Sequence, residues 1–357
     1  MKPPRLLTFI AARTGGVGIF WENLCRQFPS IDIVRVAEAE RTWFDRTSRT
    51  LHVSPFDPLH HVHGLLAREL DLTQYDALVA NERFELEFFL SRAAGRPVVF
   101  IVHGNHPHYY GTVLRYAGHI DRILCVSATA VAYLRAHGVA HAVEFAYSIF
   151  VDVPPAPLRR DRVVYVGRFE PDKNIHETFA IFQFLKRQAY EVRLIGVGSL
   201  ASEIAAQFDP AEVLVGLPRE AVLAEMAQAR FLCLNSYVEG LPVTYLEARH
   251  FQLGVLCSYL DSSMHRVLGA NATLCSDLDA LLRWMRAFSF QPPASPARVN
   301  NPALNDTLLS LIASTPVNTS TLPSPTIGGW LDRTTWLPPR LVGTLRRARW
   351  QARRPSA

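Results

Sequence analysis

The chain of 357 residues carries a formal net charge of +5, with 49% hydrophobic and 19% charged residues. This is the composition of an ordinary soluble globular protein, the length predicts two domains, and the mild positive charge says little about the fold. No apolar run reaches the ~20 residues of a membrane-spanning helix. The five cysteines are scattered without a CxxC pair, so we expect buried reduced thiols in a cytosolic protein rather than disulfides or zinc sites.

The N-terminus predicts a strand, a glycine turn and a helix. Residues 5–12 are mostly apolar, but this stretch is short for a signal peptide and leads into Arg13, so a first β-strand is favoured. Gly15 and Gly16 follow, and residues 19–28 then carry apolar side chains at helical spacing. Glycines in such a turn let the backbone approach a ligand and leave helix N–H groups available, although a glycine loop alone does not define a site.

The next stretch continues an alternating α/β pattern. Three segments read as buried strands, and one between them reads as a helix: strands 31–36, 75–80 and 97–102, and the helix 85–94. Four histidines in the same part of the chain raise the alternative of a metal site: His52, His60, His61 and His63. Their spacing repeats no ligand pattern, so ordinary surface or core histidines are the preferred interpretation.

A second group of histidines stands at the end of the strand 97–102. His103 lies where that strand ends, which is where parallel sheets contact ligands. His106 and His108 follow closely, so a metal cluster is again an alternative, and no role is assigned to these two. Residues 120–127 predict another strand, and Ser127 is placed to cap the helix 128–137.

A proline-rich segment, residues 151–160, predicts a linker between two domains. The α/β pattern then restarts with a strand at 162–166 and a long helix at 175–188. The loop between them holds Arg168 and Lys173, five residues apart at the carboxyl end of a strand. Two fixed cations there suit a diphosphate, because they stabilise negative charge on a leaving phosphate; a solvated basic loop is the alternative.

The second half continues with strands at 191–195 and 213–216, a helix at 218–229, and a short buried strand at 231–234. A polar loop with Glu239 and Gly240 at its tip follows that strand, and Pro242 suits the first position of the next helix.

Glu247 lies about a turn and a half inside that helix. Its side chain is therefore expected to lean back toward the loop of Glu239. Two carboxylates beside a helix N-terminus suit a nucleotide sugar, since carboxylates accept hydrogen bonds from vicinal diols and helix N–H groups bind phosphate. Two solvated acids on an exposed helix are the alternative.

These residues carry a resemblance to a known family. The segment from Ser236 to Ala248, with Glu239-x7-Glu247, resembles the signature of retaining GT-B glycosyltransferases, especially glycosyltransferase family 4. The spacing Gly167-Arg168-x4-Lys173 is similar to the second signature of that family. The resemblance covers roughly residues 5–290 and is firmest from 160 to 260.

The resemblance implies a fold, a reaction and roles for the matching residues. The implied fold is α/β of the GT-B type, with two Rossmann-like domains that face each other across a cleft. The implied reaction transfers a sugar from a nucleoside diphosphate sugar with retention of configuration, through a front-face mechanism that needs no metal or other cofactor. Glu239 and His103 would then hold the donor sugar, Glu247 the ribose, and Arg168 and Lys173 the leaving diphosphate.

The full set of candidate site residues follows from the motifs and the resemblance together. The catalytic candidates are Arg168, Lys173, Glu239 and His103. The candidates for donor and nucleotide binding are Glu247, Gly15, Gly16, Gly167, Gly240, Leu241 and Pro242. No metal ligand is predicted.

Two departures from the family pattern leave the phosphate side and the donor identity open. Gly254 is kept after the second acid, but the usual proline beside it is lost. Asp261-Ser262-Ser263 replaces the usual glycine pair and acid.

The C-terminal part changes in composition. Residues 291–340 are rich in proline and polar residues, which predicts irregular or partly disordered chain with one helix at 304–313. Five arginines fall within Arg346–Arg354, so this segment suits either an anionic membrane surface or a solvated tail. The predicted organisation is an N-terminal domain at 1–150, the linker 151–160, a nucleotide-sugar domain at 161–290 and an extension at 291–357.

The predicted partners are a nucleoside diphosphate sugar and a glycan or lipid-linked acceptor, by analogy in surface polysaccharide or lipopolysaccharide synthesis. The expected location is the cytoplasm, with a candidate peripheral contact on the inner face of the membrane. Three alternatives stay open: another GT-B enzyme such as a nucleotide-sugar epimerase or a phosphorylase, a non-catalytic carbohydrate- or nucleotide-binding relative, and a nucleic-acid-binding protein. Joint retention of both cations and both acids disfavours the second. The absence of a basic patch with interleaved aromatics disfavours the third.

Overall fold

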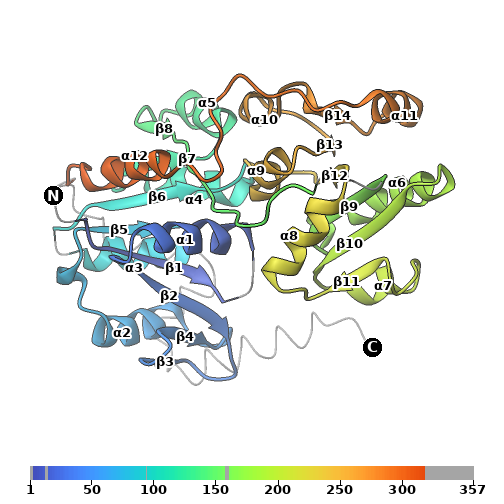
Figure 1. The fold of residues 1–357 in the computed structure, drawn as a ribbon. Helices are drawn as coiled ribbons and strands as arrows, with labels where there is room; N and C mark the ends of the chain where they lie inside the picture. Colours follow the sequence, from blue (N-terminus) through green and yellow to red (C-terminus); the bar gives the residue numbers. More distant parts are fainter. Residues whose placement is uncertain (1–2, 13–14, 94, 157–160, 318–357) are drawn as a thin grey trace. The chain divides into compact units, whose positions relative to one another are not determined.

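A computed structural model describes residues 3–12, 15–93, 95–156 and 161–317 of the chain. The described elements alternate strongly between strands and helices, and the strands form two sheets (Figure 1). The chain moves from one sheet to the other between residues 144 and 162. No helix within the described ranges is long and apolar enough to cross a membrane.

The first sheet contains eight strands in the order β3-β4-β2-β1-β5-β6-β7-β8. Its strands are β1 (Leu6–Ala11), β2 (Ile31–Glu38), β3 (Trp43–Asp45), β4 (Thr50–Val53), β5 (Ala77–Ala80), β6 (Val98–Val102), β7 (Arg122–Cys125) and β8 (Ala142–Glu144). The helices of this part are α1 (Gly16–Gln27), α2 (Leu59–Glu69), α3 (Arg83–Arg92), α4 (Pro107–Tyr116) and α5 (Ala128–Ala136). β1 pairs in parallel with both β2 and β5, as expected for strands joined by crossover helices.

The second sheet contains six strands in the order β11-β10-β9-β12-β13-β14. Its strands are β9 (Arg162–Arg168), β10 (Glu191–Val197), β11 (Val213–Val215), β12 (Phe231–Leu234), β13 (Gly254–Cys257) and β14 (Ala272–Leu274). The helices that follow β9 along the chain are α6 (Ile175–Arg187), α7 (Ala201–Ala205), α8 (Arg219–Gln228), α9 (Val243–His250), α10 (Ser262–Leu268), α11 (Leu278–Ala287) and α12 (Pro302–Ala313). All pairs in this sheet are parallel, and the order reproduces the 3-2-1-4-5-6 arrangement of a Rossmann fold.

The first four residues of β9 are buried because this strand lies in the middle of the second sheet. Val163, Val164 and Tyr165 are fully buried, which matches the near-continuous apolar run expected for a parallel strand covered on both faces. α6 packs against β10 and α8 against β9. The two Rossmann-like sheets confirm the α/β fold class predicted from the sequence.

By its packing, the chain divides into two compact units. Of the described residues, those within 1–102, 111–124 and 309–317 form the first unit, and those within 103–110 and 125–308 form the second. The domain boundaries at 150 and 290 and the cleft stay predictions. The helix expected at 304–313 is present as α12, whereas the basic segment Arg346–Arg354 lies outside the described residues.

The antiparallel strand β3 and its partner β4 were not expected from the sequence. The turn between them contains no glycine, and Arg49 adopts the left-handed conformation (φ 51°) that usually marks a glycine position. Asp45 stabilises this turn by accepting hydrogen bonds from the backbone N–H groups of Thr47 and Ser48. His52 stacks on Trp43 with ring centroids 4.1 Å apart, so this histidine has a packing role.

The histidines offered as a metal alternative do not form a cluster. Burial lowers the pKa of His63, whose Nε2 lies 3.2 Å from the backbone carbonyl oxygen of Phe84. His106 and His108 are exposed neighbours, with their Nδ1 atoms 2.7 Å apart. Across the described ranges, no group of three or more His, Cys, Asp or Glu side chains is arranged to hold a metal ion.

The core of the first unit is organised around a buried amide, that of Asn81 at the end of β5. Its Oδ1 accepts from the Trp21 indole N–H at 2.8 Å. Its Nδ2 donates to Thr8 Oγ1 at 2.9 Å and to the carbonyl of Phe9 at 2.8 Å. One side chain therefore connects β1, β5 and α1 while it satisfies polar atoms that water does not reach.

We expect Asn81→Ala to lower the free energy of unfolding by about 2 kcal/mol, because it leaves the buried Trp21 indole N–H without its acceptor. Urea unfolding measures this loss. The exposed amide of Gln74 in the same unit supplies the control, and Gln74→Ala should change the free energy by no more than about 0.5 kcal/mol. Equal unfolding midpoints for the two variants would contradict the role assigned to Asn81.

Candidate functional site

The order of the second sheet determines where a ligand site can form. β9 and β12 are neighbours, and the chain runs outward from them in opposite directions along the sheet. The loops that follow the two strands therefore diverge at their carboxyl ends, which is where open α/β sheets bind ligands. The loop after β9 carries Arg168 and Lys173, and the loop after β12 carries Glu239. Both signature motifs thus meet at this switch point.

The loop after β9 is built by a sharp turn. A short 3-10 helix, η2 (Pro171–Lys173), is followed by Asn174 in the left-handed conformation (φ 50°), and α6 begins at the next residue. Gly167 lies on β9, where a Cβ atom would stand 2.8 Å from the hydroxyl oxygen of Tyr165. That hydroxyl donates to the backbone carbonyl of Arg168 at 2.6 Å, so a side chain at position 167 would disturb the start of the loop.

The structure brings Lys173 and Glu239 into direct contact. Lys173 Nζ lies 2.6 Å from Glu239 Oε1, and the side chains are only 16% and 14% exposed. An ion pair this sheltered is screened less by solvent than a surface pair, so its members hold each other in place. A cation and a carboxylate from two separate motifs therefore share one small volume.

Arg168, in the same loop as Lys173, has its own partner. Its Nη2 donates to Asp172 Oδ2 at 2.8 Å, and both side chains are about half exposed (50% and 46%). Burial raises the pKa of the Tyr165 hydroxyl, with Glu239 raising it further and Arg168 lowering it. Both charges therefore act on the same hydroxyl, and the Arg168 guanidinium remains accessible to solvent.

The loop tip of Glu239 is fixed by a tyrosine from the next strand connection. The hydroxyl of Tyr259 donates to the backbone carbonyl of Glu239 at 2.6 Å and accepts from its backbone N–H. The hydroxyl of Tyr147 donates to the backbone carbonyl of Leu241 at 3.2 Å. Neither tyrosine could be identified from local sequence patterns, because each lies far from the loop along the chain.

His103 and Gly104 pack directly on the loop of Glu239. A Cβ atom at Gly240 would lie 2.6 Å from the carbonyl oxygen of His103 and 2.8 Å from the Cα of Gly104. Only a glycine at position 240 permits this approach. The His103 side chain is half-buried, and desolvation lowers its pKa to about 3. The imidazole is therefore neutral near neutral pH and acts as a hydrogen-bonding group rather than as a cation.

We expect Gly240→Ala to lower the melting temperature, because the new methyl group must push the His103 backbone away from the Glu239 loop. The loss of stability should be about 1–3 kcal/mol, measured by thermal and urea unfolding. Gly64 is the matched control, since a Cβ atom there has no neighbour within 4 Å. Gly64→Ala in the helix α2 should be neutral or slightly stabilising. A Gly240→Ala variant as stable as Gly64→Ala would refute the close approach.

The helix α9 starts one residue later than expected. Pro242 is the N-cap rather than the first helical residue, because its ψ of 135° is extended, and α9 begins at Val243. Glu247 is on this helix and is fully buried. The partner that the structure records for its carboxylate is Arg219, the first residue of α8, whose Nη2 donates to Oε1. The sequence analysis did not single out Arg219.

Within the described part of the chain, several buried polar atoms around β12 and α9 have no hydrogen-bond partner. They are Asn235 Nδ2, Ser236 Oγ, Thr244 Oγ1 and Glu247 Oε2. Buried polar atoms are nearly always paired in native proteins, so a group of unpaired ones calls for an explanation such as a bound water or ligand. These atoms lie in the loop after β12 and in α9, the same two segments that carry the predicted site residues Glu239 and Glu247.

The departure from the family pattern at Asp261 has a structural consequence. Asp261 caps α10, since its carboxylate accepts from the backbone N–H of Met264 at 2.8 Å. The same carboxylate accepts from Thr129 Oγ1 at 3.0 Å, and Ser263 Oγ accepts from the backbone N–H of Ala128 at 2.8 Å. The segment that replaces the glycine turn therefore connects the start of α10 to the start of α5 by hydrogen bonds.

The glycine turn near the N-terminus belongs to the first unit. Gly15 is the N-cap of α1 and Gly16 is its first residue. A Cβ atom at Gly15 would have no neighbour within 4 Å among the described residues, and its extended backbone (φ −169°) suits any residue, so neither their packing nor the backbone conformation requires glycine there. Its role near donor phosphates stays a prediction.

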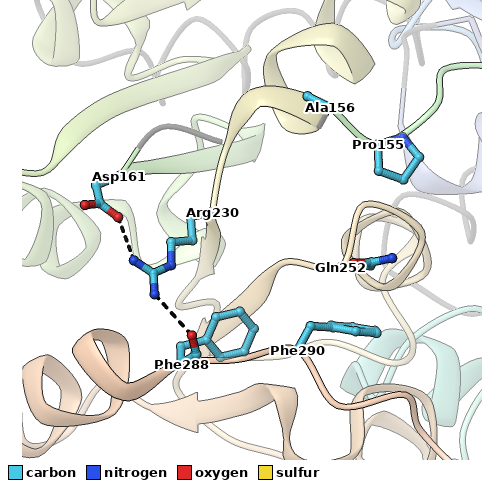
Figure 2. A pocket seen from close by; sticks show the side chains of 7 residues that line it. All are labelled: Pro155, Ala156, Asp161, Arg230, Gln252, Phe288 and Phe290. Atoms are coloured by element: carbon cyan, nitrogen blue, oxygen red, sulfur yellow. Dashed lines mark hydrogen bonds and ion pairs between the residues drawn. The ribbon is translucent and has the colours of Figure 1, made fainter. Parts of the chain in front are cut away.

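A surface cavity of about 740 Å³ lies elsewhere in the second unit (Figure 2). Its lining residues are Pro155, Ala156, Asp161, Arg230, Gln252, Phe288 and Phe290. Asp161, Arg230 and Gln252 precede β9, β12 and β13, so the cavity opens at the amino ends of the strands, away from the switch-point loops. Arg230 donates to Asp161 at 2.7 Å and to the carbonyl of Phe288 at 3.1 Å, as Figure 2 shows. This cavity is not the predicted site.

The second half of the chain matches a known family. Residues 150–277 match the model of glycosyl transferases group 1. This group 1 segment, residues 150–277, is less than half of the chain and contains the Lys173–Glu239 pair together with Glu247 and Arg219. A comparison with curated protein sequences found no match.

Solved structures resemble the chain over most of its length. HepE of Anabaena, in complex with UDP and glucose, has a TM-score of 0.64 at 14% identity, over 87% of this chain and 100% of that one. WaaG, a glycosyltransferase involved in lipopolysaccharide biosynthesis, has 0.60 at 12% identity, over 87% and 100%. Sucrose-phosphate synthase of Thermosynechococcus elongatus has 0.59 at 13% identity, over 97% and 98%. At such low identity these likenesses show the fold, which is the GT-B fold predicted from the sequence.

Proposed function

We propose that this chain is a retaining glycosyltransferase of the family 4 type, which moves a sugar from a nucleoside diphosphate sugar to a glycan or lipid-linked acceptor. The observation that carries the proposal is the 2.6 Å contact between Lys173 and Glu239 at the switch point, with the Glu247 helix following the same loop. This arrangement offers one cation for a phosphate and two carboxylates for hydroxyl groups. A nucleoside diphosphate sugar carries both kinds of group on one molecule.

In the proposed mechanism, Lys173 and Arg168 stabilise the negative charge that develops on the leaving diphosphate. Lys173 is now paired with Glu239, so binding of a donor would place a phosphate where it shares this cation. Arg168 is half exposed and pairs with the equally exposed Asp172, so its guanidinium can turn toward the same phosphate. The N-terminus of α9 supplies further N–H donors.

The sugar and the ribose would be held by the remaining candidates. Glu239, fixed by Tyr259, accepts from sugar hydroxyls, and neutral His103 contributes a hydrogen bond beside it. Glu247 accepts from the ribose. A front-face transfer, in which the leaving phosphate takes the acceptor proton, is compatible with these groups, and no metal is invoked. A role in surface polysaccharide or lipopolysaccharide synthesis, at the inner membrane face, is part of the proposal by analogy with relatives such as WaaG.

A thermal-shift screen against UDP, GDP, ADP and CDP tests the proposal. A ligand that binds only the folded state raises the melting temperature, by an amount equivalent to about 2.7 kcal/mol at 100 times its Kd. One nucleotide should stabilise the chain far more than the others, which would also name the base. No stabilisation by any of the four at millimolar concentration would contradict the proposal.

Retention needs a separate experiment. The matching nucleoside diphosphate sugar and a model acceptor are incubated with the enzyme, and the anomeric coupling of the new linkage is read by NMR. The proposed mechanism predicts the same anomeric configuration in product and donor. An inverted product would overturn the retaining mechanism, and binding without any transfer would favour a non-catalytic nucleotide-binding protein.

A further inference from the structure

Arg219 connects the first turn of α8 to the fully buried carboxylate of Glu247. Its Nη2 donates to Glu247 Oε1. The Glu247 side chain is 0% exposed, whereas that of Arg219 is 24% exposed. Arg219 is therefore the member of the pair that solvent or a ligand meets first.

The two oxygen atoms of Glu247 are in different situations. Oε1 accepts from Arg219, while Oε2 is buried and has no hydrogen-bond partner among the residues that the structure describes. A carboxylate oxygen has lone pairs for hydroxyl donors, and leaving them unused in a buried position costs free energy. The arginine therefore occupies one oxygen of the carboxylate, and the buried second oxygen keeps its capacity to accept a hydrogen bond.

The direction of Glu247 Oε2, and so the position of a group that could donate to it, depends on Arg219 and on the helix α9. Arg219 fixes the side-chain rotation of Glu247, since a guanidinium hydrogen bond to one oxygen sets the direction of the other. Thr244 stands three residues earlier on α9, on the same side as Glu247, and its Oγ1 is also buried without a partner. A polar ligand group at this position would find two unused polar atoms.

We infer that Arg219 is a positioning residue that orients Glu247 so that Oε2 accepts the ribose diol of the donor, which makes nucleotide affinity depend on the ribose hydroxyls. This inference rests on the proposed function and adds to it the residue that sets ribose recognition. Arg219 itself acts through Glu247. Its removal leaves a buried carboxylate without its cation and without a fixed orientation.

The test compares each protein's affinity for the preferred nucleoside diphosphate with its affinity for the 2′,3′-dideoxy form, by calorimetry. The wild type should bind the ribose form at least about tenfold more tightly, as expected for hydrogen bonds to a charged group. In Arg219→Gln this ratio should fall to about one, while the affinity for the dideoxy form changes by less than about twofold. Arg219→Lys, which keeps the charge, should restore part of the ratio.

Arg230→Gln is the matched control, because Arg230 belongs to the same unit and is similarly exposed at 30%. It pairs with Asp161 at the amino ends of the strands, away from the candidate site. This variant should keep the wild-type ratio. The inference is overturned if Arg219→Gln keeps that ratio, or if it weakens both ligands equally while melting temperatures stay comparable. A wild type that binds no nucleoside diphosphate would instead overturn the proposed function, and this inference with it.

Discussion

Lys173→Ala is expected to reduce turnover by about 10²–10³-fold, the usual cost of removing one group that stabilises transition-state charge. Lys173 is mostly buried, and its Nζ lies 2.6 Å from Glu239 Oε1. A lysine on the surface therefore cannot take its position in the variant. The loss should appear chiefly in kcat, because charge on the leaving phosphate increases as the glycosidic bond breaks. Steady-state kinetics with the preferred nucleotide sugar measures it.

Lys186→Ala is the matched control for this variant. Lys186 is on α6 of the same unit, and its Nζ contacts Glu212 at 2.8 Å on the surface. Its removal should leave turnover within about twofold, since exposed ion pairs contribute little. Lys173→Ala frees the carboxylate of Glu239, so Lys173→Gln provides a second variant with less change in volume. Normal turnover in both Lys173 variants would remove the lysine from the mechanism.

Glu247→Ala is expected to weaken binding of the nucleoside diphosphate by about 10–100-fold, because the hydroxyls of the ribose lose a charged acceptor. The same variant should lower the melting temperature, since Arg219 loses its partner and the buried side chain leaves a space. Calorimetric titration gives the affinity, and unfolding gives the stability. Glu247→Gln keeps the shape of the side chain and separates the two effects.

Glu203→Ala serves as the control for Glu247→Ala. Glu203 is exposed on α7 and pairs with His176 at 3.2 Å, so its loss should change neither affinity nor stability by a measurable amount. The Glu247→Gln variant should keep most of the stability and still lose affinity. If it binds the nucleotide as the wild type does, Glu247 is a structural residue and the ribose assignment is wrong.

Much of the fold could be predicted from local pattern. The strand 231–234 has the predicted bounds, and the helix after Ser127 starts with the predicted cap, because Ser127 Oγ accepts from the backbone N–H of Ala130. Such elements depend on residues a few positions apart, so periodicity and capping residues reveal them. The hairpin of β3 and β4 was missed since its turn relies on Asp45 and Arg49 instead of glycine or proline.

The candidate site could be predicted only in part, because some of its residues are close in sequence and others are not. Glu239 and Glu247 are close in sequence and their spacing on a loop and a helix is readable, as is that of Arg168 and Lys173. The contact of Lys173 with Glu239 follows once β9 and β12 are neighbours. Tyr259 reaches the site from the loop after β13, and Arg219 from the start of α8. No local pattern distinguishes them from any other tyrosine or arginine.

We propose that one nucleoside diphosphate sugar is bound at the switch point of the second sheet. A crystal structure of the chain with the nucleotide that the thermal-shift screen selects would locate the ligand. We expect the β-phosphate within hydrogen-bonding distance of Lys173 or Arg168 and the ribose hydroxyls on Glu247. A nucleotide seated elsewhere, such as in the cavity at Arg230, with Lys173 still paired to Glu239, would contradict it.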